Sequence, residues 1–253
     1  MRIKSAYTSH QPIFAWEDDF PKAYGQTSIA FLKRCIGFED AKNGDYLAAI
    51  GVVKKCVKET KISALLENYP NATLLPIPGR NVLPLAYAES INLPVWKNVS
   101  IQNTTPRKSL FAAQRLLHKP TFSGYICKDR NYIIVDDIVT QGGTIAAMRE
   151  FVLANGGNVV AVTALAFSIG SHYIAPKKTM ISRLFAKFGH AILKLELYGY
   201  VDSFGELTHS QIRYLLKFSS VRNIFNKIEH TKSLCDLDTA KLTYFPQLKK
   251  LCE

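Results

Sequence analysis

The stretch Tyr132–Met148, YIIVDDIVTQGGTIAAM, decides the fold. Its apolar start predicts a buried strand over 132–136, which ends on two adjacent carboxylates, Asp136 and Asp137. A Thr-Gln-Gly-Gly-Thr tract then leads into apolar residues at helical spacing, which predict a helix over 144–157. A strand, a glycine-rich turn and a helix in this order are typical of a parallel α/β sheet.

The same alternation continues on both sides of this stretch. Short apolar runs at 72–79, 93–96 and 158–168 predict further strands, and the spacing at 82–91 predicts a helix. Because the strands lack polar alternation, we expect helices on both faces of the sheet. The sequence therefore predicts an α/β fold built from right-handed βαβ units.

The two ends of the chain follow other patterns. Residues 1–26 lack clear periodicity and predict an irregular arm, whereas 28–36, 45–57 and 62–68 are compatible with helices. Basic, aromatic-rich helical segments follow Ser171, and Thr208 has the hydroxyl and the position of a helix cap. We divide the chain into a mainly helical N-terminal region packed on the core (1–70), a core (71–170) and a basic, mainly helical C-terminal appendage (171–253).

Composition narrows the classes of function. No apolar run approaches the roughly 18 residues of a membrane span, so we expect no membrane partner, and the N-terminus lacks the apolar core of a signal peptide. The five cysteines are scattered without a C-x-x-C pair, which favours reduced thiols and a cytoplasmic location. The net charge of +12 suits an anionic partner: a phosphorylated metabolite, nucleic acid or an acidic protein.

The turn after the strand predicts an anion site. Ligands of parallel sheets bind at the carboxyl ends of the strands, where a helix N-terminus presents unpaired N–H groups and partial positive charge. Gly142 and Gly143 allow close approach of the backbone, and Thr140 and Thr144 add hydroxyl groups. The two carboxylates would repel a phosphate, so they must face hydroxyl groups or a metal ion. A ribose 5-phosphate meets both demands; a tight turn with a capping Asp is the purely structural alternative.

These residues also carry a family resemblance. YIIVDDIVTQGGT resembles the phosphoribosyl pyrophosphate (PRPP) signature of type I phosphoribosyltransferases: four apolar positions, two acids, two apolar positions and T-x-G-x-T. Residues 74–168 are similar to the ComF-like branch, in which a proline-rich first strand (here LLPIPGRN) precedes a basic R…L…R segment (here TTPRKSLFAAQRLLHKPTFSG). The chain departs from the pattern of this branch in two ways. It lacks the N-terminal cysteine zinc knuckle, and it has Gln141 where many members have Thr or Ala.

The resemblance implies a Rossmann-like, parallel-sheet core and a glycosyltransferase of nucleotide metabolism. Such an enzyme transfers phosphoribosyl from PRPP to a nitrogenous base, here unknown, and releases pyrophosphate with the help of Mg²⁺. The implied catalytic residues are Asp136, Asp137, Arg107 and Arg115, and the two acids are also the implied Mg²⁺ contacts, directly or through water. The implied 5-phosphate site is Thr140, Gln141, Gly142, Gly143 and Thr144, and the implied pyrophosphate loop contains Gly79, Arg80 and Asn81.

Several of these residues have a simpler reading. Arg80 is equally compatible with a solvated loop charge, and Arg107, Lys108 and Arg115 with a solvated basic helix face. Three further side chains can stack on the base or form hydrogen bonds to it: Phe167, Tyr173 and Lys177. The alternative for each is a role in the core or on the surface.

A second function class is a non-catalytic ComF-like protein that senses PRPP or nucleotides or associates with nucleic acid. Residues 171–253 hold 13 Lys and Arg against 7 Asp and Glu, a net +6. Aromatic and cationic side chains alternate there, in the sets Arg183, Phe185, Lys187, Phe188 and Arg213, Tyr214, Lys217, Phe218. They suit a nucleic-acid strand, or else a core-facing aromatic stripe with solvated lysines. A second copy of the chain, in a homodimer, is the other partner left open.

Overall fold

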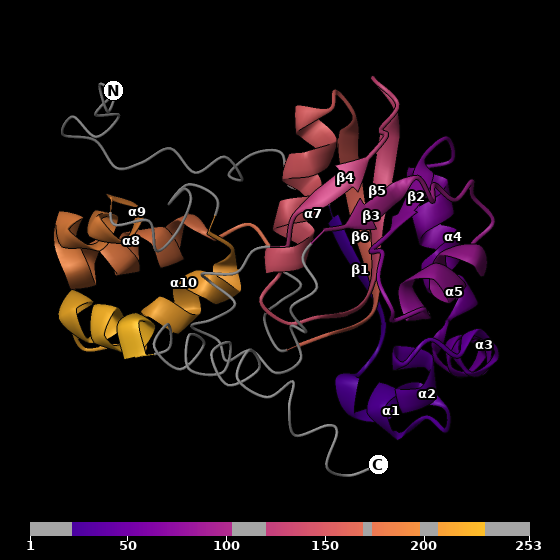
Figure 1. The fold of residues 1–253 in the computed structure, drawn as a ribbon, viewed down its shortest axis with the longest axis horizontal. Helices are drawn as coiled ribbons and strands as arrows, with labels where there is room; N and C mark the ends of the chain where they lie inside the picture. The colour runs from indigo at the N-terminus through magenta and orange to yellow at the C-terminus, as the bar shows by residue number, and fades with distance from the viewer. Residues whose placement is uncertain (1–21, 103–119, 169–173, 198–206, 231–253) are drawn as a thin grey trace, which may run out of the picture.

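A parallel sheet lies between two layers of helices (Figure 1). The computed structural model describes residues 22–102, 120–168, 174–197 and 207–230. Within these ranges the sheet has the strand order β1-β6-β5-β2, and each neighbouring pair is parallel. The strands are β1 (Lys22–Thr27), β2 (Thr73–Pro76), β5 (Asn131–Val139) and β6 (Asn158–Phe167). The predicted α/β fold with a parallel sheet is confirmed.

Helices cover both faces of the sheet. In Figure 1, α7 lies on one side, and α3, α4 and α5 lie on the other. The helices of this part of the chain are α1 (Ile29–Arg34), α2 (Phe38–Lys42), α3 (Tyr46–Cys56), α4 (Glu59–Asn68), α5 (Leu83–Glu89) and α7 (Gly143–Ala154). All but α2 fall on segments with predicted helical spacing.

The alternation of side chains along β5 explains these two layers. Ile133 and Val135 belong to the hydrophobic cluster that includes the N-terminal helices, whereas Tyr132 and Ile134 belong to the cluster that includes α7. All four side chains are fully buried. Burying an aliphatic side chain of this size stabilises the fold by about 2 kcal/mol, so an apolar run without polar alternation holds both helical layers.

A small antiparallel pair lies beside the main sheet. It consists of β3 (Val99–Ile101) and β4 (Phe122–Gly124). Gly124 has a φ of +129°, and a Cβ there would lie 2.1 Å from the carbonyl oxygen of Asn98, so only glycine fits. The strand predicted at 93–96 is reduced to one parallel bridge between Leu74 and Val95.

The predicted irregular arm over 1–26 is wrong for residues 22–26. They belong to β1, which pairs with β6 in the register Tyr24 to Thr163. The strand reads KAYGQT, whose polar residues hide it from pattern analysis. Gln26 is nevertheless buried, because its Nε2 donates a hydrogen bond to the Tyr87 hydroxyl at 2.7 Å.

The C-terminal helices build a hydrophobic cluster of their own. They are α8 (Lys178–Phe188), the 3₁₀ helix η2 (Gly189–Leu193), α9 (Lys194–Leu197), α10 (His209–Leu215) and a helical stretch over 221–230. Thr208 caps α10 as predicted: its hydroxyl accepts from the N–H of Gln211, whose side chain accepts from the N–H of Thr208. The boundaries of the three regions stay a prediction. Across the described ranges, no helix has the length and apolar character needed to cross a membrane.

Candidate functional site at the carboxyl ends of β2 and β5

The two acids of the signature lie inside β5. The strand continues through both carboxylates to Val139, whereas the sequence predicted its end at Asp136. Pro76, the last residue of β2, pairs with Val135. The loop that follows β2 therefore starts beside Asp136 and Asp137, at the sheet edge where parallel folds bind ligands.

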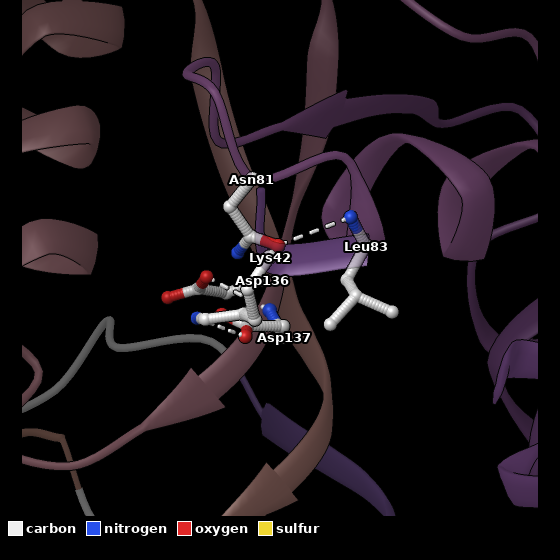
Figure 2. A network of polar contacts seen from close by, with 5 residues as sticks. All are labelled: Lys42, Asn81, Leu83, Asp136 and Asp137. Carbon is white, nitrogen blue, oxygen red and sulfur yellow. Dashed lines mark hydrogen bonds and ion pairs between the residues drawn. The ribbon is translucent and has the colours of Figure 1, made fainter. Parts of the chain in front are cut away.

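Asp137 forms an ion pair that the sequence did not reveal. Its Oδ2 lies 2.5 Å from Nζ of Lys42, the last residue of α2, and the two side chains are 6% and 14% exposed (Figure 2). An opposite charge at this distance offsets much of the cost of burying the carboxylate. Since α2 itself was not predicted, and its lysine is 95 residues away from the acid in sequence, no sequence signal pointed to Lys42.

Asp136 is buried at the end of the sheet. It is 9% exposed, and its Oδ1 accepts the N–H of Asp137 at 2.8 Å (Figure 2). Burial raises the pKa of Asp136 well above its usual range, and the neighbouring Asp137 charge raises it further. Both carboxylates are thus largely covered by other parts of the chain.

The loop after β2 closes onto the end of α2. Nε of Arg80 donates to the carbonyl oxygen of Asn43 at 3.1 Å. The N–H of Val82 donates to the carbonyl oxygen of Ala41 at 3.2 Å. These bonds bring the predicted pyrophosphate loop and Lys42 to one place. Asn81 accepts the N–H of Leu83 through its Oδ1, which fixes the start of α5 (Figure 2).

Gly79 leaves space beside this loop. Its φ of +149° lies in the region that favours glycine, and a Cβ there would meet nothing within 4 Å. Arg80, the next residue, is exposed. The backbone of this loop is therefore accessible to a ligand, as an anion-binding role requires.

The turn between β5 and α7 is built on a left-handed glycine. Gly142 is the N-cap of α7 with a φ of +75°, and no side chain caps the helix. The N–H of Ala146 makes the first helical bond, to the carbonyl of Gly142, so the N–H groups of the preceding turn point out of the helix end. Thr140 is exposed and Thr144 half-buried. Gly143, inside the first turn, is buried.

The C-terminal region packs against the other side of this turn. A Cβ on Gly142 would lie 3.2 Å from Ile174 and 3.4 Å from Thr208, and the Thr208 hydroxyl donates to the carbonyl of Gln141. The side-chain oxygen Oε1 of Gln141 is buried and has no hydrogen-bond partner within the described residues. A buried polar atom without a partner is rare, and this one sits at the predicted phosphate turn.

The structure describes only some of the remaining predicted site residues. Arg107, Lys108, Arg115 and Tyr173 lie outside the described residues. Phe167 is half-buried at the end of β6. Lys177 is exposed and lines a groove in the C-terminal region, together with His209.

The acids alone do not form a magnesium site. Asp137 is paired with Lys42, Asp136 accepts a backbone N–H, and neighbouring side chains of a strand alternate in direction. In the part of the chain that the structure describes, no three His, Cys, Asp or Glu side chains gather to hold an ion. Mg²⁺ would need oxygen atoms from a ligand here, and its binding stays a prediction.

Two curated proteins are similar to this chain in sequence. Protein TraN of Escherichia coli is 28% identical over 223 residues, which cover 83% of this chain and 49% of TraN. An uncharacterized protein of Haemophilus influenzae is 29% identical over 162 residues, which cover 60% of this chain and 36% of that protein. The matched part of the chain thus spans half or less of the length of these relatives. No family model matches the chain.

Three solved structures are similar to parts of this chain. A purine phosphoribosyltransferase from Pyrococcus horikoshii has a TM-score of 0.30 and 18% identity, over 43% of this chain and 68% of that one. UMP synthase of Leishmania donovani has a TM-score of 0.31 and 18% identity, over 67% and 33%. The adenine phosphoribosyltransferase of Trypanosoma brucei, solved with AMP, pyrophosphate and ribose-5-phosphate, has a TM-score of 0.30 and 15% identity, over 46% and 55%.

Proposed function

We propose that the protein binds PRPP at the carboxyl ends of β2 and β5 and transfers its phosphoribosyl group to a nitrogenous base. One observation carries the proposal: the turn Thr140–Thr144 joins a strand with two buried acids directly to a helix that starts on an uncapped, left-handed glycine. Anion-binding groups and sugar-binding groups thereby lie next to each other in the chain.

The turn would hold the 5-phosphate. α7 has 12 residues, and its N-terminus carries partial positive charge and N–H groups that no side chain caps. The hydroxyls of Thr140 and Thr144 are accessible beside them. A phosphate there would receive several charge-assisted hydrogen bonds, each worth about 1.5–3 kcal/mol.

Asp136 and Gln141 would hold the ribose hydroxyls. Hydroxyl groups that donate hydrogen bonds to Asp136 favour its ionised form. The hydroxyls of the ribose would therefore offset part of the cost of burying this charge. The buried Oε1 of Gln141 is an acceptor of the same kind. The Lys42–Asp137 ion pair would fix the strand end against α2 and keep the neighbouring carboxylate in place.

The loop after β2 would receive the pyrophosphate. The accessible backbone at Gly79 and the exposed guanidinium of Arg80 suit a doubly charged phosphate chain. In the reaction a nitrogen of the base forms a bond to C1 of the ribose while the bond from C1 to the pyrophosphate oxygen breaks. The base loses a proton, and pyrophosphate leaves with the bonding electrons. The site would contribute by positioning and charge complementarity.

A second candidate function is PRPP binding without turnover. The observation that favours it is the Lys42–Asp137 ion pair, which occupies one of the two acids that the family resemblance implies as catalytic. A sensor needs only the phosphate turn and Asp136.

Pyrophosphate release tests the first proposal and separates it from the second. PRPP would be incubated with the protein and a panel of purines, pyrimidines and other nitrogenous bases. The enzyme proposal expects pyrophosphate release that depends on one base or class of bases and is lost in Asp136→Asn. Binding of PRPP without release under every condition would favour the sensor, and absence of binding would overturn both.

A further inference from the structure

A groove lies between α8 and α10 in the C-terminal region. Its volume is about 390 Å³, and all of its lining residues come from positions 177–217. Four of them are cations: Lys177, Arg183, Arg213 and Lys217. No carboxylate is among its lining residues in the described part of the chain. The proposed PRPP site does not use these side chains.

The charge of the groove points to an anion. All four cationic side chains are exposed, and a groove lined by cations of one sign attracts anions. Arginine pairs phosphate oxygens with two parallel hydrogen bonds, and lysine adds a point charge. Arg183 in α8 and Lys217 just after α10 bring one guanidinium group and one ammonium group to the groove.

The remaining lining residues suit a ligand that is not only an anion. Met180 and Leu216 are half-buried apolar side chains of the groove, and methionine adapts well to aromatic rings. His209 is 7% exposed, and its Nδ1 accepts the N–H of Lys177 at 3.4 Å. With Nδ1 as acceptor, the neutral imidazole carries its proton on Nε2.

We propose that this groove binds a nucleotide, with its phosphates on the cationic side chains and its base against Met180 and Leu216. The volume lies in the range of small-molecule pockets, about 300–1,000 Å³. The nucleotide is either a free nucleoside polyphosphate or one unit of a nucleic-acid single strand, since both offer a phosphate next to a planar ring.

Two charge-matched double variants of the full chain test this. Arg183→Gln/Lys217→Gln removes two positive charges from the groove, and Arg222→Gln/Lys194→Gln removes two exposed positive charges outside it. Substitutions of exposed side chains of this kind change stability little. Thermal unfolding would verify that both variants fold like the wild type.

Binding of ATP and of a short labelled single-stranded oligonucleotide would be followed at several salt concentrations. We expect at least one of them to bind, with affinity that falls as salt rises. The groove variant should lose about tenfold or more in affinity, and the control variant about twofold or less. ATP binding identifies the free nucleotide as the ligand, and oligonucleotide binding alone identifies the strand. The proposal would be overturned if both variants lost affinity equally, if neither lost affinity, or if neither probe bound. ATP that binds at the PRPP site instead would show no loss of affinity in either variant.

Discussion

Nζ of Lys42 lies 2.5 Å from Oδ2 of Asp137 and joins the end of α2 to the strand that carries the candidate site. Both side chains are largely buried, at 14% and 6% exposure. A buried ion pair adds little compared with an apolar pair, but removal of one partner leaves an uncompensated charge.

Lys42→Met should therefore destabilise the protein by on the order of 3 kcal/mol, because it leaves Asp137 buried and unpaired. Urea unfolding measures the loss. Lys97→Met is the control, since it breaks an ion pair with Glu89 whose side chains are 57% and 28% exposed, and exposed pairs contribute about 0–1 kcal/mol. The double variant Lys42→Met/Asp137→Leu should regain much of the loss. Equal effects of both single lysine variants would contradict a buried, structural pair.

Asp136→Asn should stabilise the protein at neutral pH. Burial and the Asp137 charge raise the pKa of Asp136 in the folded state, so its contribution to stability is present at acidic pH and is lost as pH rises through the raised pKa. The asparagine variant has no such loss and should be more stable by about 1 kcal/mol above that range. Urea unfolding at a series of pH values would show the gap opening as pH rises. A variant less stable than wild type at neutral pH would count against this account.

Gly142→Ala should both destabilise the fold and weaken PRPP binding. A left-handed conformation costs a residue with a Cβ about 1–2 kcal/mol, and the new methyl group would press on Ile174 and Thr208. Gly51→Ala in α3 is the matched control, because its Cβ would meet nothing within 4 Å. Alanine there should stabilise the helix by about 0.5–1 kcal/mol. Urea unfolding and PRPP titration would compare the two, and unchanged PRPP affinity in Gly142→Ala would argue against the phosphate role of the turn.

Thr208→Val tests the link between α10 and the turn. The change removes the helix cap and the hydrogen bond to the carbonyl of Gln141; lost caps cost about 1 kcal/mol. Ser28→Ala removes a comparable cap, on α1. Both variants should lose stability in thermal unfolding, Thr208→Val more so because it also loses a second hydrogen bond at a buried residue, but only Thr208→Val should bind PRPP more weakly. Similar PRPP affinity in the two would show that the C-terminal region does not support the turn.

The sheet and its helices could be predicted because their signals are local. Apolar runs such as the one before Asp136 bury a strand on both faces, and the turn at Gly142 separates that strand from the next helix. The cap at Thr208 was predictable for the same reason, since it depends on residues three apart. β1 was missed because its buried Gln26 is satisfied by Tyr87, 61 residues away.

The site was predictable only in part. The turn and its two acids are contiguous in sequence, so one short stretch was enough to predict that they lie next to each other. Lys42 was missed because its role arises from α2 reaching the end of β5. Burial of both acids was missed for a related reason: covering residues, including Lys42, come from elsewhere in the chain. Pair distances of this kind depend on tertiary packing, which periodicity does not encode.

Calorimetric titration of PRPP, with Mg²⁺ in the buffer, into wild type and Asp136→Asn tests the central claim most directly. The account predicts saturable binding by wild type and an affinity lower by about tenfold or more in the variant, although the variant is the more stable protein. A folded wild type that does not bind PRPP, or a variant that binds it equally well, would contradict the account.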